Sequence, residues 1–412
     1  MIALSRNNQR IVASPIIRLG SLRRQFGLSL VELLVALIIG LLVSLAVYGV
    51  LTTNEGYKRT TNSVNDIDKA GTYASYEIDQ AIRSAGSGLI GGINSSSGIQ
   101  SAGYSIGCQI NASNTGTQVL PAPATLPTPF NNLPAPLNGA PINFRLAPVI
   151  ILAGAAPAGD DILVVMSGNS GLSQTGTKFS NIPTATTFNL TNVADFLPSD
   201  VVLVVKPPTP LAMSPCLIEQ VDPAFVPAPG ASSVPLAGQF YSANVNGNAL
   251  TGYPVTSYAM SLGQSPTFNL FGVGTNNTLY KYDLLQQQTI STVNNPNPSP
   301  FVDRVFQMRA LYGIYTTPGN PATLTWVAPT GAYSAATLLS GTPAANATIS
   351  NIKAIKIGII MQTSLPEKGN VSANSIQLFT STPIPVTVNL AALNYRYRTF
   401  EVTVPLRNAL ML

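Results

Sequence analysis

The sequence predicts an α+β protein with one long N-terminal helix packed on an antiparallel β-rich C-terminal domain that carries long insertions. Three observations predict this fold class. An apolar stretch opens at residue 28, helical periodicity then continues to residue 86, and short β-rich runs follow with proline- and glycine-rich connections. We expect a leader over 1–27, a helix over 28–86 with a membrane-spanning and an amphipathic half, and a β-rich head over 87–412.

Residues 28–51 are apolar apart from Glu32. The 19 residues from Leu33 to Leu51 carry no charge, which is about enough to cross the hydrocarbon layer at 1.5 Å per residue. A secretory signal peptide has a shorter apolar stretch that is followed by a small residue at the cut. Here the stretch is longer and Gly27 precedes it, so we expect a membrane-spanning helix.

The helix is expected to continue beyond the membrane. Apolar or small residues recur every three or four positions, as on the buried face of a helix: Val64, Ile67, Gly71, Ala74, Ile78, Ala81, Ile82 and Ala85. Gly86 and Gly88 supply a stop signal, whereas Asn54 and Gly56 could interrupt the helix earlier. The β-rich runs follow at Ile162–Met166, Val201–Lys206, Leu217–Val221, Val305–Tyr312, Ile352–Met361, Ile376–Phe379 and Phe400–Val404.

Charge is scarce, at 9% of the residues, and unevenly placed. The first 27 residues hold five arginines and no acid, and the remainder balances 16 basic side chains against 16 acidic ones. Positive charge holds a segment on the cytoplasmic side of a membrane. The neutral remainder has no basic field with which to recruit nucleic acid, so no nucleic-acid partner is expected.

Cys108 and Cys216 are the only cysteines, and the chain has no histidine. In an exported chain two cysteines favour a disulfide over a metal pair, with two buried free thiols as the alternative. A bridge closing so long a loop would stabilise the fold by about 4–5 kcal/mol in the chain-entropy model. It requires an oxidising compartment.

Catalysis is not expected. Without histidine there is no histidine base or histidine metal ligand, and we predict no enzymatic activity, no cofactor and no metal. Asp160 and Asp161 are the one adjacent acidic pair, and neighbours in a strand point to opposite faces. The GxGxxG match at 86–91 follows a helix instead of a strand. The alternation of aromatic and basic residues at 395–398 is typical of a strand with one solvated face.

The most informative motif is RRQFGLSLVE over residues 23–32. A lone carboxylate in an apolar helix costs about 2.5–3.5 kcal/mol even on insertion scales, so it is retained where it finds a partner. The alternative is a single-span anchor whose Glu32 reaches the headgroups. The motif resembles the class III signal of type IV prepilins, with a basic leader, glycine at the cut and glutamate at the fifth mature position.

The resemblance implies that a prepilin peptidase cleaves after Gly27 and N-methylates Leu28 as the mature terminus. It also implies that Glu32 is the assembly carboxylate, which neutralises the terminal amine of a neighbouring subunit. This agrees with physical expectation, because opposite charges in an apolar core compensate one another only when paired. Two departures are Leu28, where many pilins have Phe, and Gly49, where many have a helix-bending Pro.

Other segments resemble PilW-type minor pilins over about a third of the chain: Tyr57, Tyr73–Gly86 (YASYEIDQAIRSAG), residues 103–108, Val305–Tyr312, Ile352–Gln362 with Pro366-Glu367-Lys368, and Tyr395–Asn408. Residues 110–300 resemble no family that we can name. The likeness implies a pilin-like fold and a minor pilin that primes and takes part in type IV pilus assembly near the tip.

Partners implied by the resemblance are other minor pilins, the major pilin, the prepilin peptidase, the inner-membrane assembly platform and a tip adhesin. The chain would cross the inner membrane once, with its head in the periplasm, and then join the pilus at the cell surface. Two alternatives stay open at this point. One is a J-type minor pseudopilin of type II secretion, which is usually much shorter. The other is an adhesive or DNA-uptake pilin whose insertion contacts surfaces.

The leader and its cut give a first prediction. Mass spectrometry of the protein from piliated cells should find N-methyl-Leu28 as the first residue, and Gly27→Val should leave the precursor uncut. A mature protein that starts elsewhere, or keeps its leader, would exclude the class III signal.

Overall fold

The computed structural model describes residues 29–89, 105–170, 176–207, 212–286, 297–317 and 323–408. By its internal contacts the chain divides into two compact units, residues 1–59 and 60–412, and each is described by itself. The leader, including Gly27, and the expected mature terminus Leu28 lie outside the described residues.

One helix, α1, runs from Leu30 to Ser84 without interruption at Asn54 or Gly56. Its buried residues recur at spacings of three and four: Ser63, Ile67, Gly71, Ala74, Ile78 and Ile82. From Ile67 onward this is the stripe that the sequence predicts, whereas Ser63 is buried in place of the expected Val64, and Val64 and Ala81 are half-buried. The stripe therefore lies entirely in the second unit, where α1 packs on the β-rich head.

The end of α1 is closed by residues from both sides of the sequence. Gly86 and Gly88 follow with φ angles of 79° and 67°, the left-handed conformation that commonly terminates helices. The side-chain amide of Asn408 donates to the carbonyl oxygens of Ser84 (3.4 Å) and Ala85 (2.9 Å). A helix leaves its last four carbonyls without helical partners, and Asn408 satisfies two acceptors there.

The C-terminal sheet has four antiparallel strands in the order β17-β16-β18-β21, with bounds β16 Val305–Tyr315, β17 Leu324–Val327, β18 Ile352–Gln362 and β21 Tyr397–Pro405. Ile355, Ile357 and Ile359 of β18 join the main core, which also contains Ile67 and Ile78 of α1. Alternate residues of a strand point to opposite faces. One face of the sheet therefore carries this core.

A hairpin of β19 (Ser375–Leu378) and β20 (Val386–Asn389) covers the other face of that sheet. Ile360 of β18 and Leu311 of β16 pack there with Leu378, Phe379, Val388 and Leu390 in a core of their own. The four-stranded sheet is consequently covered on both faces.

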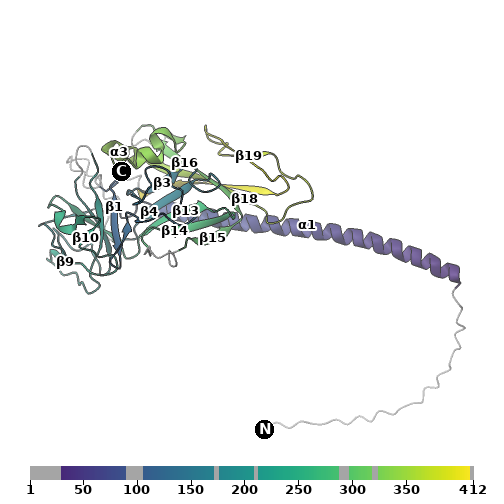
Figure 1. Ribbon diagram of the computed structural model, residues 1–412, viewed down its shortest axis with the longest axis horizontal. Helices are drawn as coiled ribbons and strands as arrows, with labels where there is room; N and C mark the ends of the chain where they lie inside the picture. The colour runs from purple at the N-terminus through teal and green to yellow at the C-terminus, as the bar shows by residue number, and fades with distance from the viewer. Residues whose placement is uncertain are drawn as a thin grey trace, which may run out of the picture. The chain divides into compact units, whose positions relative to one another are not determined.

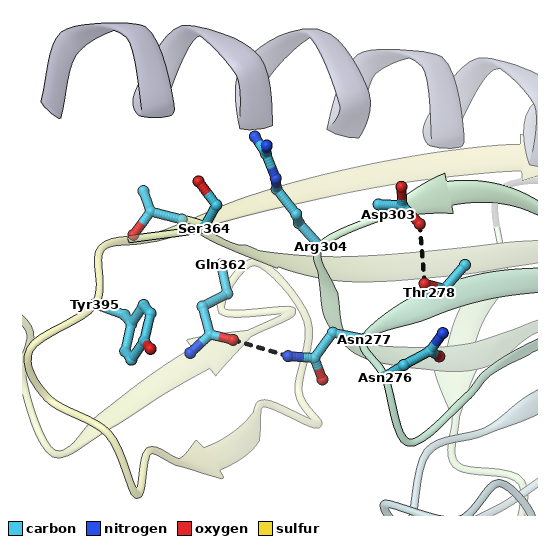
Figure 2. A pocket seen from close by; sticks show the side chains of 9 residues that line it. Asn276, Asn277, Thr278, Asp303, Arg304, Gln362, Ser364 and Tyr395 are labelled. Atoms are coloured by element: carbon cyan, nitrogen blue, oxygen red, sulfur yellow. Dashed lines mark hydrogen bonds between the residues drawn. The ribbon is translucent and has the colours of Figure 1, made fainter. Parts of the chain in front are cut away.

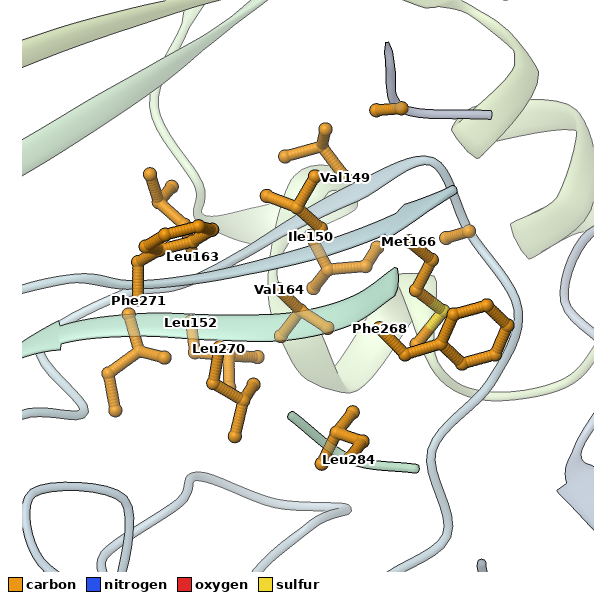
Figure 3. Packing of buried hydrophobic residues seen from close by; sticks show 14 of the residues in the cluster. Val149, Ile150, Leu152, Leu163, Val164, Met166, Phe268, Leu270, Phe271 and Leu284 are labelled. Carbon is orange, nitrogen blue, oxygen red and sulfur yellow. The ribbon is translucent and has the colours of Figure 1, made fainter. Parts of the chain in front are cut away.

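A five-stranded antiparallel sheet has the order β15-β14-β13-β4-β3, with bounds β3 Val149–Leu152, β4 Ile162–Ser167, β13 Thr267–Val273, β14 Thr278–Asp283 and β15 Ser299–Asp303. Figure 3 shows part of its packing, in which Val164, Met166, Phe268 and Leu284 lie on one side of the sheet and Val149 on the other. These side chains belong to the same main core as the stripe of α1.

A six-stranded sheet has the order β2-β1-β8-β7-β12-β5, with bounds β1 Ile110–Asn114, β2 Thr117–Leu120, β5 Thr177–Lys178, β7 Val201–Val205, β8 Cys216–Gln220 and β12 Tyr258–Gly263. Its pairs are antiparallel except β1 with β8, which is parallel. Val201, Leu203 and Val205 join the main core, whereas Val202 and Val204 join a second core.

The second core lies under short elements: β6 Thr187–Asn189, β9 Ser233–Pro235, β10 Asn244–Val245, β11 Asn248–Ala249 and the 3-10 turn η1 Leu250–Gly252. Figure 1 shows β9 and β10 at the opposite end of the second unit from β18. Within the part of the chain that the structure describes, further short helices are η3 Gly331–Tyr333, α2 Ala335–Leu338 and α3 Pro343–Ser350.

The predicted fold class, a long apolar N-terminal helix followed by an antiparallel β-rich domain, is confirmed. All seven β-rich runs coincide with strands: β4, β7, β8, β16, β18, β19 and β21. The runs that the sequence analysis leaves unassigned are mostly short strands of two to four residues, such as β5 and β10.

Gly71 gives a prediction about how α1 packs. A Cβ at this position would overlap the ring of Phe400 on β21. Gly71→Ala should therefore lower the free energy of unfolding by about 1–3 kcal/mol, although alanine favours the helix by about 1 kcal/mol. Gly56→Ala, where nothing lies within 4 Å of the added carbon, is the matched control and should not destabilise.

Denaturant unfolding of the full chain in micelles measures both variants. Phe400→Leu should relieve the cost of Gly71→Ala in a double-mutant cycle. Equal effects of Gly71→Ala and Gly56→Ala would contradict the close approach of helix and strand.

Glu219 of β8 is fully buried beside the second core. The backbone N–H of Ser242 donates to its Oε2 at 3.1 Å, while Oε1 has no hydrogen-bond partner. Burial raises the pKa of this carboxyl from 4.5 to about 9, and the Ser242 hydrogen bond only partly opposes that shift. The folded protein therefore holds a proton that the unfolded chain releases at much lower pH.

This difference predicts that stability falls as the pH rises from about 4.5 to 9. Each proton lost on unfolding contributes a slope of about 1.4 kcal/mol per pH unit. Asp160, whose pKa burial raises to about 7, adds to the slope only below that pH. Denaturant unfolding should show the free energy of unfolding falling between pH 7 and 9. Glu219→Gln should remove this pH dependence, whereas the control Glu77→Gln on α1 should keep it. The same pH dependence in Glu219→Gln would refute this account.

Candidate assembly site

The first unit contains the apolar part of α1. Its large hydrophobic side chains from Leu30 to Leu51 are exposed on every side of the helix, at 49% to 77%. The helix is long and apolar enough to cross a membrane, and none of its apolar window is buried. Such a surface requires an apolar environment, which lipid or other apolar helices provide.

Glu32 lies in the first turn of α1 and forms a reciprocal pair with Ser29. The backbone N–H of Ser29 donates to Oε2 of Glu32 at 3.2 Å, and the N–H of Glu32 donates to Oγ of Ser29 at 3.1 Å. This is a capping box, which satisfies two donors at the helix start. The carboxylate also lies at the positive end of the helix dipole.

The cap was not predicted, although the spacing Ser29-Leu30-Val31-Glu32 fits the capping-box pattern S/T-x-x-E and is a sequence signal for it. The Ser29 hydroxyl and the Glu32 carboxylate thus have a local structural use besides the role that the resemblance implies. The expected amine partner, Leu28, lies outside the described residues. The pairing of Glu32 with that amine stays a prediction.

In the second unit, polar contacts join the first turns of the buried part of α1 to the head. Arg304 pairs with Asp66 at 3.4 Å and Arg398 pairs with Asp68 at 3.7 Å. The hydroxyl of Thr60 donates to Glu367 at 2.9 Å. Exposed ion pairs of this kind are worth about 0–1 kcal/mol each, so they orient the helix more than they stabilise it.

The alternating segment at 395–398 contributes to these contacts. Arg396 donates through Nε to Glu367 at 3.0 Å, and this hydrogen bond together with that from Thr60 lowers the pKa of the Glu367 carboxyl. Arg396 and Arg398 remain 45% and 57% exposed, as a solvated strand face requires. Tyr397 instead packs edge-on against Phe306 at 5.1 Å between ring centres.

Cys108 and Cys216 form a disulfide, as the sequence predicts, with their Cα atoms 5.7 Å apart. Both are fully buried, and the parallel pairing of Ile110 with Cys216 places β1 beside β8 at the bridge. The bridge closes a loop with a sequence separation of 108. It fastens the six-stranded sheet where its one parallel pair begins.

The acidic pair Asp160-Asp161 precedes β4 instead of lying within it, and both side chains are buried. Asp161 accepts from the backbone N–H of Ala310 at 2.9 Å and pairs with Arg309 at 3.2 Å. These contacts tie the β3–β4 turn to β16. Among the described residues no group of three potential metal ligands occurs.

Comparison with protein families gives two matches. Residues 271–408 match the family described as Type IV Pilus-assembly protein W, and residues 22–48 match the Prokaryotic N-terminal methylation motif. No curated protein and no solved structure matches the chain. The first match runs from within β13 through β21 to Asn408, and the second contains Gly27, Leu28 and Glu32.

The apolar helix behind a methylation motif, followed by an antiparallel β-rich domain, defines a prepilin-like protein of type IV pilus assembly. The match over the C-terminal sheet makes this part of the chain similar to minor pilins of the PilW type. This context implies contact with other pilus components, and the motif and helix fit a membrane-anchored pilin that is assembled into the pilus. The family match begins at residue 271, so it includes the last part of the stretch for which the sequence analysis finds no relative.

Proposed function

We propose that this protein is a minor pilin that primes type IV pilus assembly and stays near the pilus tip. The observation that carries the proposal is Glu32, the one charge in a helix segment that is otherwise apolar and exposed on every side. Lipid satisfies the apolar side chains but not the carboxylate. A filament of packed helices satisfies both, if a neighbouring subunit supplies a terminal amine.

Placement near the tip is supported by the size of the head. The second unit spans residues 60–412 and holds a second core beyond the sheet that the family match covers. A bulky head is easier to accommodate at the end of a filament than within its regular packing. The PilW match favours pilus assembly over type II secretion.

Before assembly, the proposed topology is one inner-membrane span with the head in the periplasm. The basic leader supports this orientation, because positive charge is retained on the cytoplasmic side. The disulfide supports it too, since disulfides persist in oxidising compartments. The proposed partners are other minor pilins, the major pilin, the prepilin peptidase, the assembly platform and a tip adhesin. The role is structural and requires no catalysis.

The test uses a strain that lacks the gene and in which retraction is disabled, with surface pili counted. Glu32→Ala should be cleaved and inserted normally, yet fail to restore piliation and be absent from sheared pili. The capping box allows the charge to be separated from the cap. Glu32→Gln keeps a capping side chain without the charge, whereas Ser29→Ala keeps the charge without the cap.

Glu32→Gln should fail as Glu32→Ala does, and Ser29→Ala should restore piliation, because the charge matters for pairing and the cap does not. Full restoration by Glu32→Gln would overturn the pairing role. Normal piliation in the deletion strain itself would overturn the priming role.

A further inference from the structure

A polar pocket of about 310 Å³ lies within the second unit, between the turn that joins β13 to β14, the junction of β15 and β16, and the end of β18. Figure 2 shows Arg304 pointing from the pocket toward α1, with Asn277, Gln362 and Tyr395 on the side away from the helix. A volume near 300 Å³ is at the lower end for small-molecule sites.

The backbone around the pocket is held in unusual conformations. Arg304 has a φ angle of 67°, in the left-handed region that is uncommon for a bulky residue, and Asn277, of a type that adopts this region more readily, has a φ angle of 57°. Their carbonyls are fixed, since Val305 donates to Asn277 at 2.8 Å and Gln362 donates to Arg304 at 2.9 Å. Strain maintained by surrounding structure is a feature of binding sites.

The side chains in the pocket are also oriented before any ligand arrives. Asn277 donates to Oε1 of Gln362 at 2.9 Å, and Gln362 donates through Nε2 to the hydroxyl of Tyr397 at 3.0 Å. Thr278 donates to Oδ1 of Asp303 at 2.9 Å. The amides and the carboxylate therefore keep one arrangement, which lowers the cost of binding.

The chemistry of these groups selects a class of ligand. Carboxylate and amide groups side by side accept from and donate to adjacent hydroxyls, and the ring of Tyr395 offers an apolar face. Arg304 is paired with Asp66, and Asp303 adds a negative charge, so an acidic ligand gains little. We infer that the pocket binds a neutral, hydroxyl-rich saccharide.

This inference goes beyond the proposed role in priming, because saccharide binding needs neither the apolar part of α1 nor Glu32. Every residue that it uses lies within residues 271–408 apart from Asp66, so the pocket is built by the part of the chain that matches the PilW family. Saccharides of two sources share the required chemistry. Hexose glycans occur on cell surfaces, and amino-sugar glycans occur in cell walls.

Saturation-transfer NMR measures the binding of saccharide probes to the full mature chain, in a detergent without a sugar headgroup. Lactose and cellobiose probe the hexose class, and N,N′-diacetylchitobiose probes the amino-sugar class. Binding is expected at millimolar concentration in at least one arm, and the arm that responds identifies the source. Adding a glucuronic acid group to the probe should not strengthen binding.

Three variants locate the site. Tyr395→Ala should weaken binding about tenfold, and Tyr395→Phe should keep it because the ring remains. Asn276 also lines the pocket, and its exposed side chain offers an amide to the ligand, so Asn276→Ala should weaken binding. Tyr76→Ala, which removes a 61% exposed tyrosine from α1, is the matched control. Far-ultraviolet circular dichroism checks that each variant is folded.

The inference is overturned if none of the three probes binds the wild-type protein at millimolar concentration. It is also overturned if Tyr395→Ala binds as tightly as Tyr76→Ala does, since the saccharide would then lie elsewhere. Piliation by Tyr395→Ala in the deletion strain is read separately, so loss of saccharide binding is distinguishable from loss of the assembly role.

Discussion

The structure depends on one long helix, α1, whose N-terminal and C-terminal parts require different surroundings. From Leu30 to Leu51 the helix is apolar on every side, and from Ser63 onward it buries one stripe. Within this stripe, Gly71 allows the ring of Phe400 to approach the helix backbone. The last strand, β21, is consequently held against α1. Because β21 pairs with β18, it links the rest of the C-terminal sheet to the helix.

The features that the sequence could predict are those with local signals. The spacing of Ile67, Ala74 and Ile78 indicates the buried stripe, and the β-branched runs indicate β7 and β18. The disulfide was predicted because two cysteines have few alternatives, not because the sequence gives a distance. The capping box of Ser29 and Glu32 has a local pattern as well, and the same two residues also fit the prepilin signal.

The features that the sequence could not predict depend on contacts between distant segments. The parallel pairing of β1 with β8 joins residues about 100 apart in the sequence. The second core could not be predicted either, because it depends on β7 being buried on both faces. The left-handed conformation of Arg304 has no signal in residue type, because arginine rarely adopts it. Since Val201 and Leu203 of the insertion share the main core with α1, the insertion is an integral part of the head.

The amide of Asn408 that closes the end of α1 has a consequence for the order of folding. The contacts from Asn408 to Ser84 and Ala85 span 324 and 323 residues of sequence, among the longest separations in the fold. The helix is synthesised first, but its contacts with Phe400 of β21 and with Asn408 form only after the last strand has been made. A chain released before β21 would lack both the ring of Phe400 over Gly71 and the amide of Asn408 at the helix end, so this part of the fold forms only after the C-terminal sheet has been synthesised.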